Sequence, residues 1–266
     1  MKLERFFRIC AFVSILLFAG YWLWDPTFTQ DATAQQLLKM LISRAFGSLV
    51  FLFVLCYTRY RLWQRPRWGH LAVLLPALAV AVNNLPILAL IRGWAWVERY
   101  DLVLLFATDS LMIGIFEELA FRGVLFPAML EKRRGTRKEI LLTTALSSAV
   151  FGLIHLVNLF EGAGVGPTVL QVGYSFLIGG MCAIVLLKTG NLLWCILLHA
   201  IYDFCGQLIP TVGAGALWDT PTVIITAILG VAVLVWMLTV FFRITPESIP
   251  NFYQNGEKEN EHSENQ

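Results

Sequence analysis

A charged cluster inside an apolar run constrains this chain more than any other feature of its sequence. The segment Phe-Glu-Glu-Leu-Ala-Phe-Arg-Gly occupies residues 116–123 and places Glu117, Glu118 and Arg122 in a run that otherwise has the composition of a membrane helix. A charged residue at the centre of such a helix costs roughly 2.5 to 3.5 kcal/mol, so three unpaired charges would cost on the order of 8 to 10 kcal/mol. Because this cost approaches the stability of an ordinary domain, the charges must have partners.

Helical geometry supplies a partner for two of these three charges. Glu118 and Arg122 are four residues apart, so they lie on one helix face and can pair along it. Glu117 points about 100° away from Glu118, and its carboxyl group is available for proton transfer. The segment therefore fits two interpretations, a structural ion-pair cluster that locks helices together or a catalytic group.

Composition shows that the apolar run is not an isolated feature. The chain of 266 residues is 58% hydrophobic and 14% charged, and its mean hydropathy is +0.68. Apolar runs of about 20 residues recur along its length, which is typical of membrane helices, whereas barrel strands would be about 10 residues long with alternating polarity. The sequence therefore predicts an all-α polytopic membrane protein.

We expect about eight transmembrane helices. The predicted spans are residues 6–24, 37–58, 71–92, 102–130, 140–160, 168–188, 191–209 and 221–243. The fourth span, with 29 residues, would measure about 43 Å against a hydrocarbon core of about 30 Å. It must therefore tilt, protrude or bend, and Pro127 is the expected site of a bend.

The Lys/Arg content of the connections predicts how the chain is oriented. The second and fourth connections are basic and alternate with neutral or acidic ones; the basic residues are Arg59, Arg61, Arg65, Arg67, Lys132, Arg133, Arg134, Arg137 and Lys138. This pattern places both termini in the cytoplasm, and we expect the plasma membrane of a prokaryote. Topology and contact with an anionic lipid bilayer explain the basic loops without a nucleic-acid partner.

Two further predicted spans carry polar residues one helical turn apart. Phe151 and His155 share a face of the fifth span, and His199 and Asp203 share a face of the seventh. Counted at about 1.5 Å per residue from the cytoplasmic ends, Glu117 and these groups can meet at a similar level. The sequence thus predicts that these groups meet between the fourth, fifth and seventh helices, either as an active site or as interhelical hydrogen-bonding groups.

Together the three motifs resemble those of a known family. Glu-Glu-x-x-x-Arg at residues 117–122, Phe-x-x-x-His at 151–155 and His-x-x-x-Asp at 199–203 are similar to motifs of the CAAX protease and bacteriocin-processing (CPBP, or Abi) family of intramembrane endopeptidases. This family is related to the type 2 CAAX prenyl proteases. The resemblance extends from about the fourth span to the seventh.

The resemblance implies a role for each matching residue. Glu117 would be the general base and His155 would orient the water, while His199 with Asp203 would face the oxyanion. Asp203 would either be protonated and donate, or fix the tautomer of His199 from behind. Glu118, Arg122 and Phe151 would support these groups.

Two alternatives to this interpretation remain open. No metal or other cofactor is favoured, although Glu117, His155, His199 and Asp203 also form a plausible set of zinc ligands. The function implied by the resemblance is cleavage of a membrane-associated polypeptide, as in CAAX or leader-peptide processing. The alternative is a non-catalytic immunity factor or transporter that uses the charged cluster structurally.

The remaining predictions concern domain organisation and other polar groups. We expect an N-terminal three-helix region at 1–100, a catalytic core at 101–210, a last transmembrane helix at 211–244 and a disordered cytoplasmic tail at 245–266. Asp109 lies two turns before Glu117 and either lines the same cavity or makes a structural hydrogen bond. Asn83 and Asn84 indicate polar interhelical contacts or a break in the third helix, and Gly173, Gly179 and Gly180 indicate close packing of the sixth.

Overall fold

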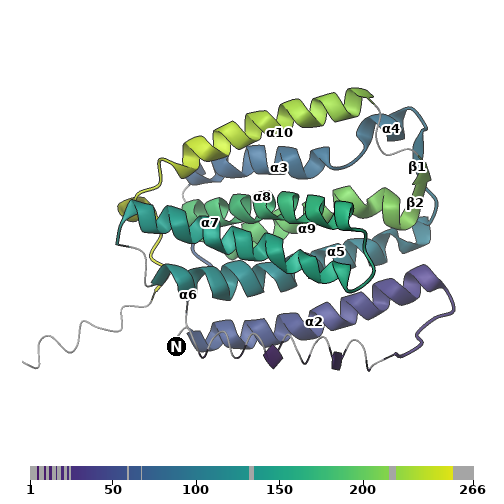
Figure 1. Cartoon of the computed structure of the whole chain (residues 1–266), viewed down its shortest axis with the longest axis horizontal. Coiled ribbons are helices and arrows are strands. Elements are labelled where there is room, and N and C mark those ends of the chain that lie inside the picture. The colour runs from purple at the N-terminus through teal and green to yellow at the C-terminus, as the bar shows by residue number, and fades with distance from the viewer. Residues whose placement is uncertain are drawn as a thin grey trace, which may run out of the picture.

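The protein is a bundle of roughly aligned helices with one very short sheet at one end (Figure 1). The computed structural model describes residues 25–58, 60–66, 68–131, 135–215 and 220–253, with single positions between residues 5 and 23. The all-α class is confirmed. The predicted first span lies outside the described residues except for those single positions, so the count of eight helices stays a prediction.

Five of the described helices are long and apolar enough to cross a membrane. They are α2 (Ala32–Thr58), α7 (Arg137–Ile154) extended by a 3₁₀ segment (η4, His155–Leu159), α8 (Val165–Thr189), α9 (Leu192–Val212) and α10 (Thr220–Phe241). These helices overlap the second, fifth, sixth, seventh and eighth predicted spans. Hydropathy predicted these helices because each contains an uninterrupted apolar run of about the length that crosses a membrane.

The fourth predicted span is helical along its whole length but changes its helix type. It consists of α5 (Val103–Glu118), a π-helical segment (η3, Leu119–Leu125) and α6 (Phe126–Glu131). Within η3 the backbone hydrogen bonds join residues five apart instead of four, so the helical turn is wider. The N–H of Phe126 donates to the carbonyl of Phe121 five residues earlier. A bend was predicted at Pro127, and the change of helix type lies in the turns just before that residue. A wider turn relieves the clash between the proline ring and the carbonyl four residues earlier.

The third predicted span, 71–92, is not one helix. It is divided into a 3₁₀ segment (η1, Trp68–Val73), α3 (Leu74–Asn83) and α4 (Ile87–Ile91). The break falls at Asn84–Pro86, where the missing N–H of Pro86 and its restriction of the preceding residue stop a helix. Asn83 Nδ2 donates to Thr226 Oγ1 at 2.9 Å and Asn84 Nδ2 to the carbonyl of Tyr202 at 3.4 Å. The asparagines therefore combine the two structural roles predicted for them.

Helices α5 and α9 cross closely at the centre of the bundle. A Cβ atom on Gly114 of α5 would lie 2.7 Å from the carbonyl oxygen of Ile196 in α9. Toward the sheet end, the rings of Phe106 and Phe204 stack at 5.6 Å between centroids. The absence of a side chain at Gly114 thus brings the two helices that carry the charged motifs into backbone contact.

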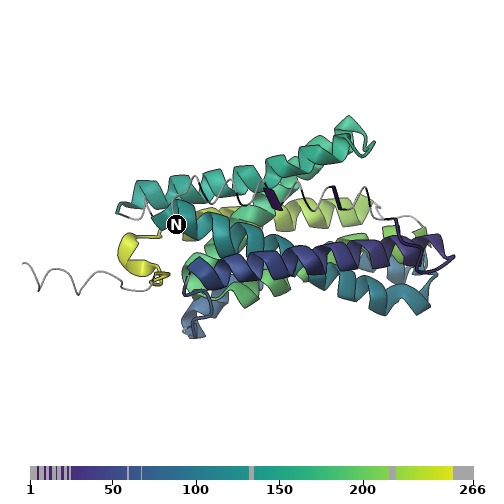
Figure 2. The ribbon, with the colours of Figure 1, turned by 90° about the horizontal axis from the view of Figure 1, so that it is seen from below.

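The α7–α8 hairpin, residues 137–189, leans away from the rest of the bundle toward its tip (Figure 2). Residues of α8 are mostly exposed from Val165 to Leu177 and mostly buried from Ile178 to Thr189. The half of the hairpin that contains His155 is therefore the open half, and its other half is packed into the core.

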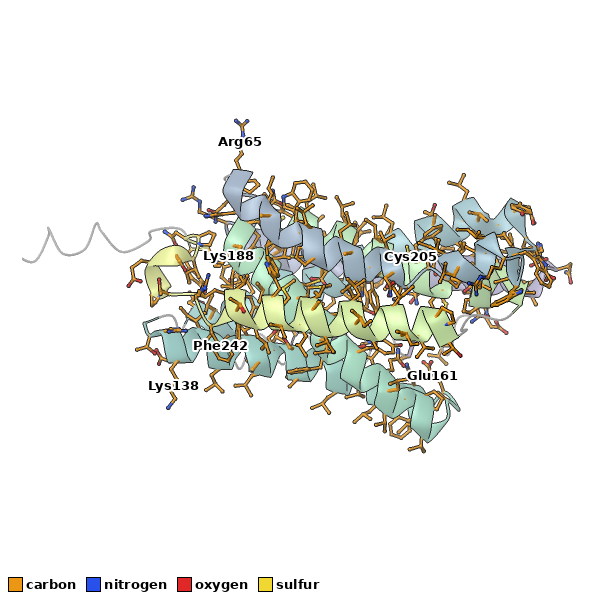
Figure 3. The ribbon with its side chains drawn as sticks, turned by 90° about the horizontal axis from the view of Figure 1, so that it is seen from above. Arg65, Lys138, Glu161, Lys188, Cys205 and Phe242 are labelled. Atoms are coloured by element: carbon orange, nitrogen blue, oxygen red, sulfur yellow. The ribbon has the colours of Figure 1, made fainter. Side chains whose placement is uncertain are left out.

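The two ends of the bundle differ in charge and in how they are closed. Arg65, Lys138 and Lys188 lie at one end, and Glu161 lies at the tip of the α7–α8 hairpin toward the other (Figure 3). At the second end, β1 (Ala95–Val97) pairs antiparallel with β2 (Gly213–Gly215). The separation agrees with the predicted alternation of basic and acidic connections, although Arg59, Arg67 and residues 132–134 and 219 lie outside the described residues.

Part of the predicted tail is packed on the basic end. Residues 244–253 fold back along the chain, with Ile244 and Phe252 almost completely buried. Tyr253 Oη donates to the carbonyl of Pro127 at 2.9 Å, and the N–H of Arg61 donates to the carbonyl of Phe252 at 2.8 Å. The predicted disordered tail thus begins nine residues too early at 245, and its remainder from 254 lies outside the described residues.

Candidate active site

The close crossing of α5 and α9 brings four charged or ionisable motif residues together. His199 Nδ1 lies 2.7 Å from Glu118 Oε1, while His199 Nε2 lies 3.5 Å from Glu117 Oε2 and 3.4 Å from Asp203 Oδ2. One imidazole ring is therefore placed among three carboxyl groups. Because a carboxylate only accepts, the short contact shows that Nδ1 carries a proton and donates to Glu118.

Exposure separates these three carboxyl groups into two kinds. The side chain of Glu118 is 0% exposed, whereas those of Glu117 and Asp203 are 24% and 21% exposed. The Nε2 side of His199 is thus the accessible side of the cluster, and the Nδ1 side is closed. A substrate could reach Glu117, Asp203 and Nε2, but not Glu118.

The predicted pairing of Glu118 with Arg122 is present. Arg122 Nη1 donates to Glu118 Oε1 at 2.9 Å, and both side chains are almost fully buried. The guanidinium also lies over the ring of Phe151, 4.4 Å from its centroid. A Cβ atom on Gly179 would come within 2.9 Å of Arg122 Nη2 and 3.0 Å of Phe151 Cδ1, so this glycine leaves room for the stacked pair.

Phe151 links the two histidines of the site. Its ring meets that of His155 at 5.3 Å and that of His199 at 5.7 Å between centroids, edge to face in both cases. His155 Nδ1 donates to the carbonyl of Phe151 at 2.9 Å, which directs its other nitrogen away from the helix. No hydrogen bond or ion pair joins His155 to Glu117, His199 or Asp203 within the described part of the chain.

The structure changes the geometric expectation for Asp203. The sequence allowed Asp203 to fix the tautomer of His199 from behind, but Glu118 occupies the Nδ1 position where such a carboxylate acts. Asp203 lies on the Nε2 side together with Glu117. Sequence spacing could not reveal the contact between Glu118 and His199, because it joins residues 81 positions apart.

One charged pair near this site was missed in the sequence. Arg44 of α2 donates through Nη1 to both carboxylate oxygens of Asp109, at 2.7 and 2.8 Å. Asp109 is buried and both of its carboxylate oxygens accept from Arg44, so its role is the structural hydrogen bond that was one of its two predicted roles. The signal was present, since Arg44 lies within the predicted span 37–58 and a membrane arginine requires a counter-charge.

The proposed zinc ligands do not gather into a metal site in this arrangement. Among the residues that the structure describes, no group of three or more His, Cys, Asp and Glu side chains could hold a metal ion. His155 is the outlying member, because it reaches the others only through the ring of Phe151.

Comparison with known proteins gives one match. The model of the type II CAAX prenyl endopeptidase Rce1-like family matches residues 99–205, which contain all three motifs and the helices that bring them together. The match confirms the resemblance seen in the sequence. No curated protein and no solved structure matches the chain.

Proposed function

We propose that this chain, whose residues 99–205 are similar to a family of CAAX prenyl endopeptidases, is an intramembrane endopeptidase. It hydrolyses a peptide bond in a membrane-associated protein or peptide, as in CAAX-type or leader-peptide processing. The observation that carries the proposal is the placement of Glu117 and Asp203 on the accessible side of His199, with Glu118 on its buried side.

Glu117 is the general base of the proposed reaction. Its carboxylate removes a proton from water while the oxygen of that water attacks the carbonyl carbon of the scissile bond. The carbon–nitrogen bond then breaks, and the proton held by Glu117 passes to the leaving nitrogen. The products are a new carboxylic acid and a new amine, and no further reactant is consumed. His155 orients this water through Nε2, because its Nδ1 already donates to the carbonyl of Phe151.

His199 and Asp203 act on the opposite side of the tetrahedral intermediate. Glu118 holds His199 through Nδ1, which fixes the ring and leaves Nε2 toward the substrate. With a proton on Nε2 as well, His199 donates a hydrogen bond to the negative oxygen. Asp203, beside Nε2, donates a second one when it is protonated.

We further propose that the reaction needs no metal. The support is the separation of His155 from the other three residues of the zinc alternative. Activity of purified protein should therefore survive extended dialysis against a chelator. Loss of activity that is restored by stoichiometric zinc would contradict this part of the proposal.

The substrate can be sought by comparing membrane proteomes. Three cell populations are needed, with the wild-type protein, without it, and with Glu117→Gln expressed at the same level. We expect at least one membrane-associated polypeptide to be cleaved only in the first population. A cleavage that depends on the protein but persists with Glu117→Gln would contradict the catalytic assignment, and no dependent cleavage would favour the non-catalytic alternative.

A further inference from the structure

Polar side chains continue outward from the site along the α7–α8 hairpin. On its first arm, Asn158 follows His155 by three residues in η4, and residues three apart in a 3₁₀ helix lie directly above one another. On its second arm, Gln171 lies one turn before Tyr174 in α8. The ring of Tyr174 meets that of Tyr202, the neighbour of Asp203, at 6.3 Å. Asn158 therefore lies next to His155 on α7–η4, and Gln171 lies next to the Tyr174–Tyr202 contact on α8.

The two amides bond to each other and leave complementary groups unused. Asn158 Nδ2 donates to Gln171 Oε1 at 2.8 Å. Neither Asn158 Oδ1 nor Gln171 Nε2 makes a hydrogen bond to another described residue, and neither atom is sealed from solvent. The pair thus presents one free acceptor and one free donor side by side.

A free acceptor beside a free donor matches the chemistry of an extended main chain. A peptide that enters the bundle at membrane depth must have its N–H and C=O groups satisfied by protein or water, since lipid provides no partner. The α7–α8 hairpin leans away from the bundle toward its tip (Figure 2), and the side chains of Asn158 and Gln171 are both partly exposed.

We propose that Asn158 and Gln171 form a subsite that binds the main chain of the substrate beside the scissile bond. Asn158 Oδ1 accepts from a substrate N–H, and Gln171 Nε2 donates to a substrate C=O. Three residues of 3₁₀ helix span about 6 Å, which equals roughly two residues of extended peptide. The amides therefore bind the peptide unit about two residues from the bond that is cleaved. This inference rests on the proposed function for the identity of the substrate.

The test replaces single amide bonds of the substrate by esters. An ester keeps the shape of the chain but removes one N–H donor. The probe is a fluorescent peptide that spans the cleavage site found in the membrane proteome comparison, with an ester at each of the four positions on either side. Binding to detergent-purified protein and the rate of cleavage are measured separately. The variants are Asn158→Ala and Gln171→Ala, and the matched control is Asn83→Ala, which removes an interhelical amide at the other side of the bundle.

One ester position should behave differently from all others. In the wild-type protein and in Asn83→Ala, the ester about two residues from the cleaved bond should weaken peptide binding about tenfold. In Asn158→Ala the amide peptide should already bind about tenfold more weakly, and that ester should cause no further loss. KM should rise in both amide variants while kcat stays within about twofold. This pattern identifies a direct contact, because a general loosening of the hairpin would affect every peptide equally.

Two results separate the failure of this inference from failure of the proposed function. If every ester peptide loses the same affinity in wild type and in Asn158→Ala, the subsite does not exist, whatever the rate of cleavage. If binding shows the expected pattern but Glu117→Gln cleaves as fast as wild type, the subsite holds and the catalytic assignment fails.

Discussion

Asp203 is the residue whose role depends most on the observed geometry. The buried carboxylate of Glu118 already holds His199 through Nδ1, so Asp203 is not needed to orient the ring. Its position beside Nε2 instead suits a donor to the oxyanion. An asparagine would keep a donor at this position and remove only the ability to be charged.

We therefore predict that Asp203→Asn retains near-normal turnover, within about tenfold of wild type. Asp203→Leu should lose about 10² to 10³ in kcat, the usual scale for removing one oxyanion donor. Both are measured as kcat and KM on the same peptide. A loss as deep in Asp203→Asn as in Asp203→Leu would show that the charge of Asp203 is required, and would contradict its role as a donor.

A second prediction at this scale concerns Gly179, which leaves room for the side chains of Arg122 and Phe151. Gly179→Ala should destabilise the protein by about 1 to 3 kcal/mol, because a Cβ atom would press on Arg122 Nη2 and the ring of Phe151. Gly173→Ala is the matched control on the same helix, since no atom lies within 4 Å of its added Cβ. Denaturant unfolding in mixed micelles compares the two. Equal effects would mean that only helix propensity matters at these positions.

At the scale of elements, hydropathy predicted helices well wherever the reason for the helix was local. The spans of α2, α7, α8, α9 and α10 follow from continuous apolar runs. The break in the third span was expected at Asn83 and Asn84 only as one of two alternatives, because the apolar run continues through Pro86. The order of residues 245–253 could not be predicted from the local sequence, because Phe252 and Tyr253 bond to residues more than 100 positions away.

The candidate site shows the same limit. Spacing predicted the pairing of Glu118 with Arg122, because the two residues lie on one helix. It could not predict the contact of Glu118 with His199, which depends on how closely Gly114 lets α5 approach α9. The predicted roles of the four site residues stay predictions, since geometry alone does not show which groups react.

The pairing of α2 with α5 gives a prediction for these two elements. Arg44→Met should destabilise the protein by about 3 to 5 kcal/mol, because it leaves the buried carboxyl of Asp109 without its partner. Adding Asp109→Leu should recover most of that loss, since no buried charge then remains. The free energy of unfolding in mixed micelles measures the cycle. Additive losses in the double variant would show that the pair does not couple the helices.

At the scale of the whole molecule, the separation of basic and acidic connections predicts the orientation in the membrane. Reporter fusions after Arg67 and after Lys138 should report a cytoplasmic location, and a fusion after Glu161 an external one. Arg65, Lys138 and Lys188 already lie at one end of the bundle (Figure 3). The reverse reporter pattern would invert the molecule and place the packed residues 244–253 on the external side.

The central claim is that Glu117 activates the water that hydrolyses a peptide bond. The most direct measurement is the rate of cleavage by purified Glu117→Gln, compared with wild type at equal folded concentration and on the same peptide. The substitution keeps the size of the side chain and removes its capacity to accept a proton. We predict unchanged unfolding and a loss in kcat of at least about 10² to 10⁴. Cleavage by Glu117→Gln at the wild-type rate would contradict the claim.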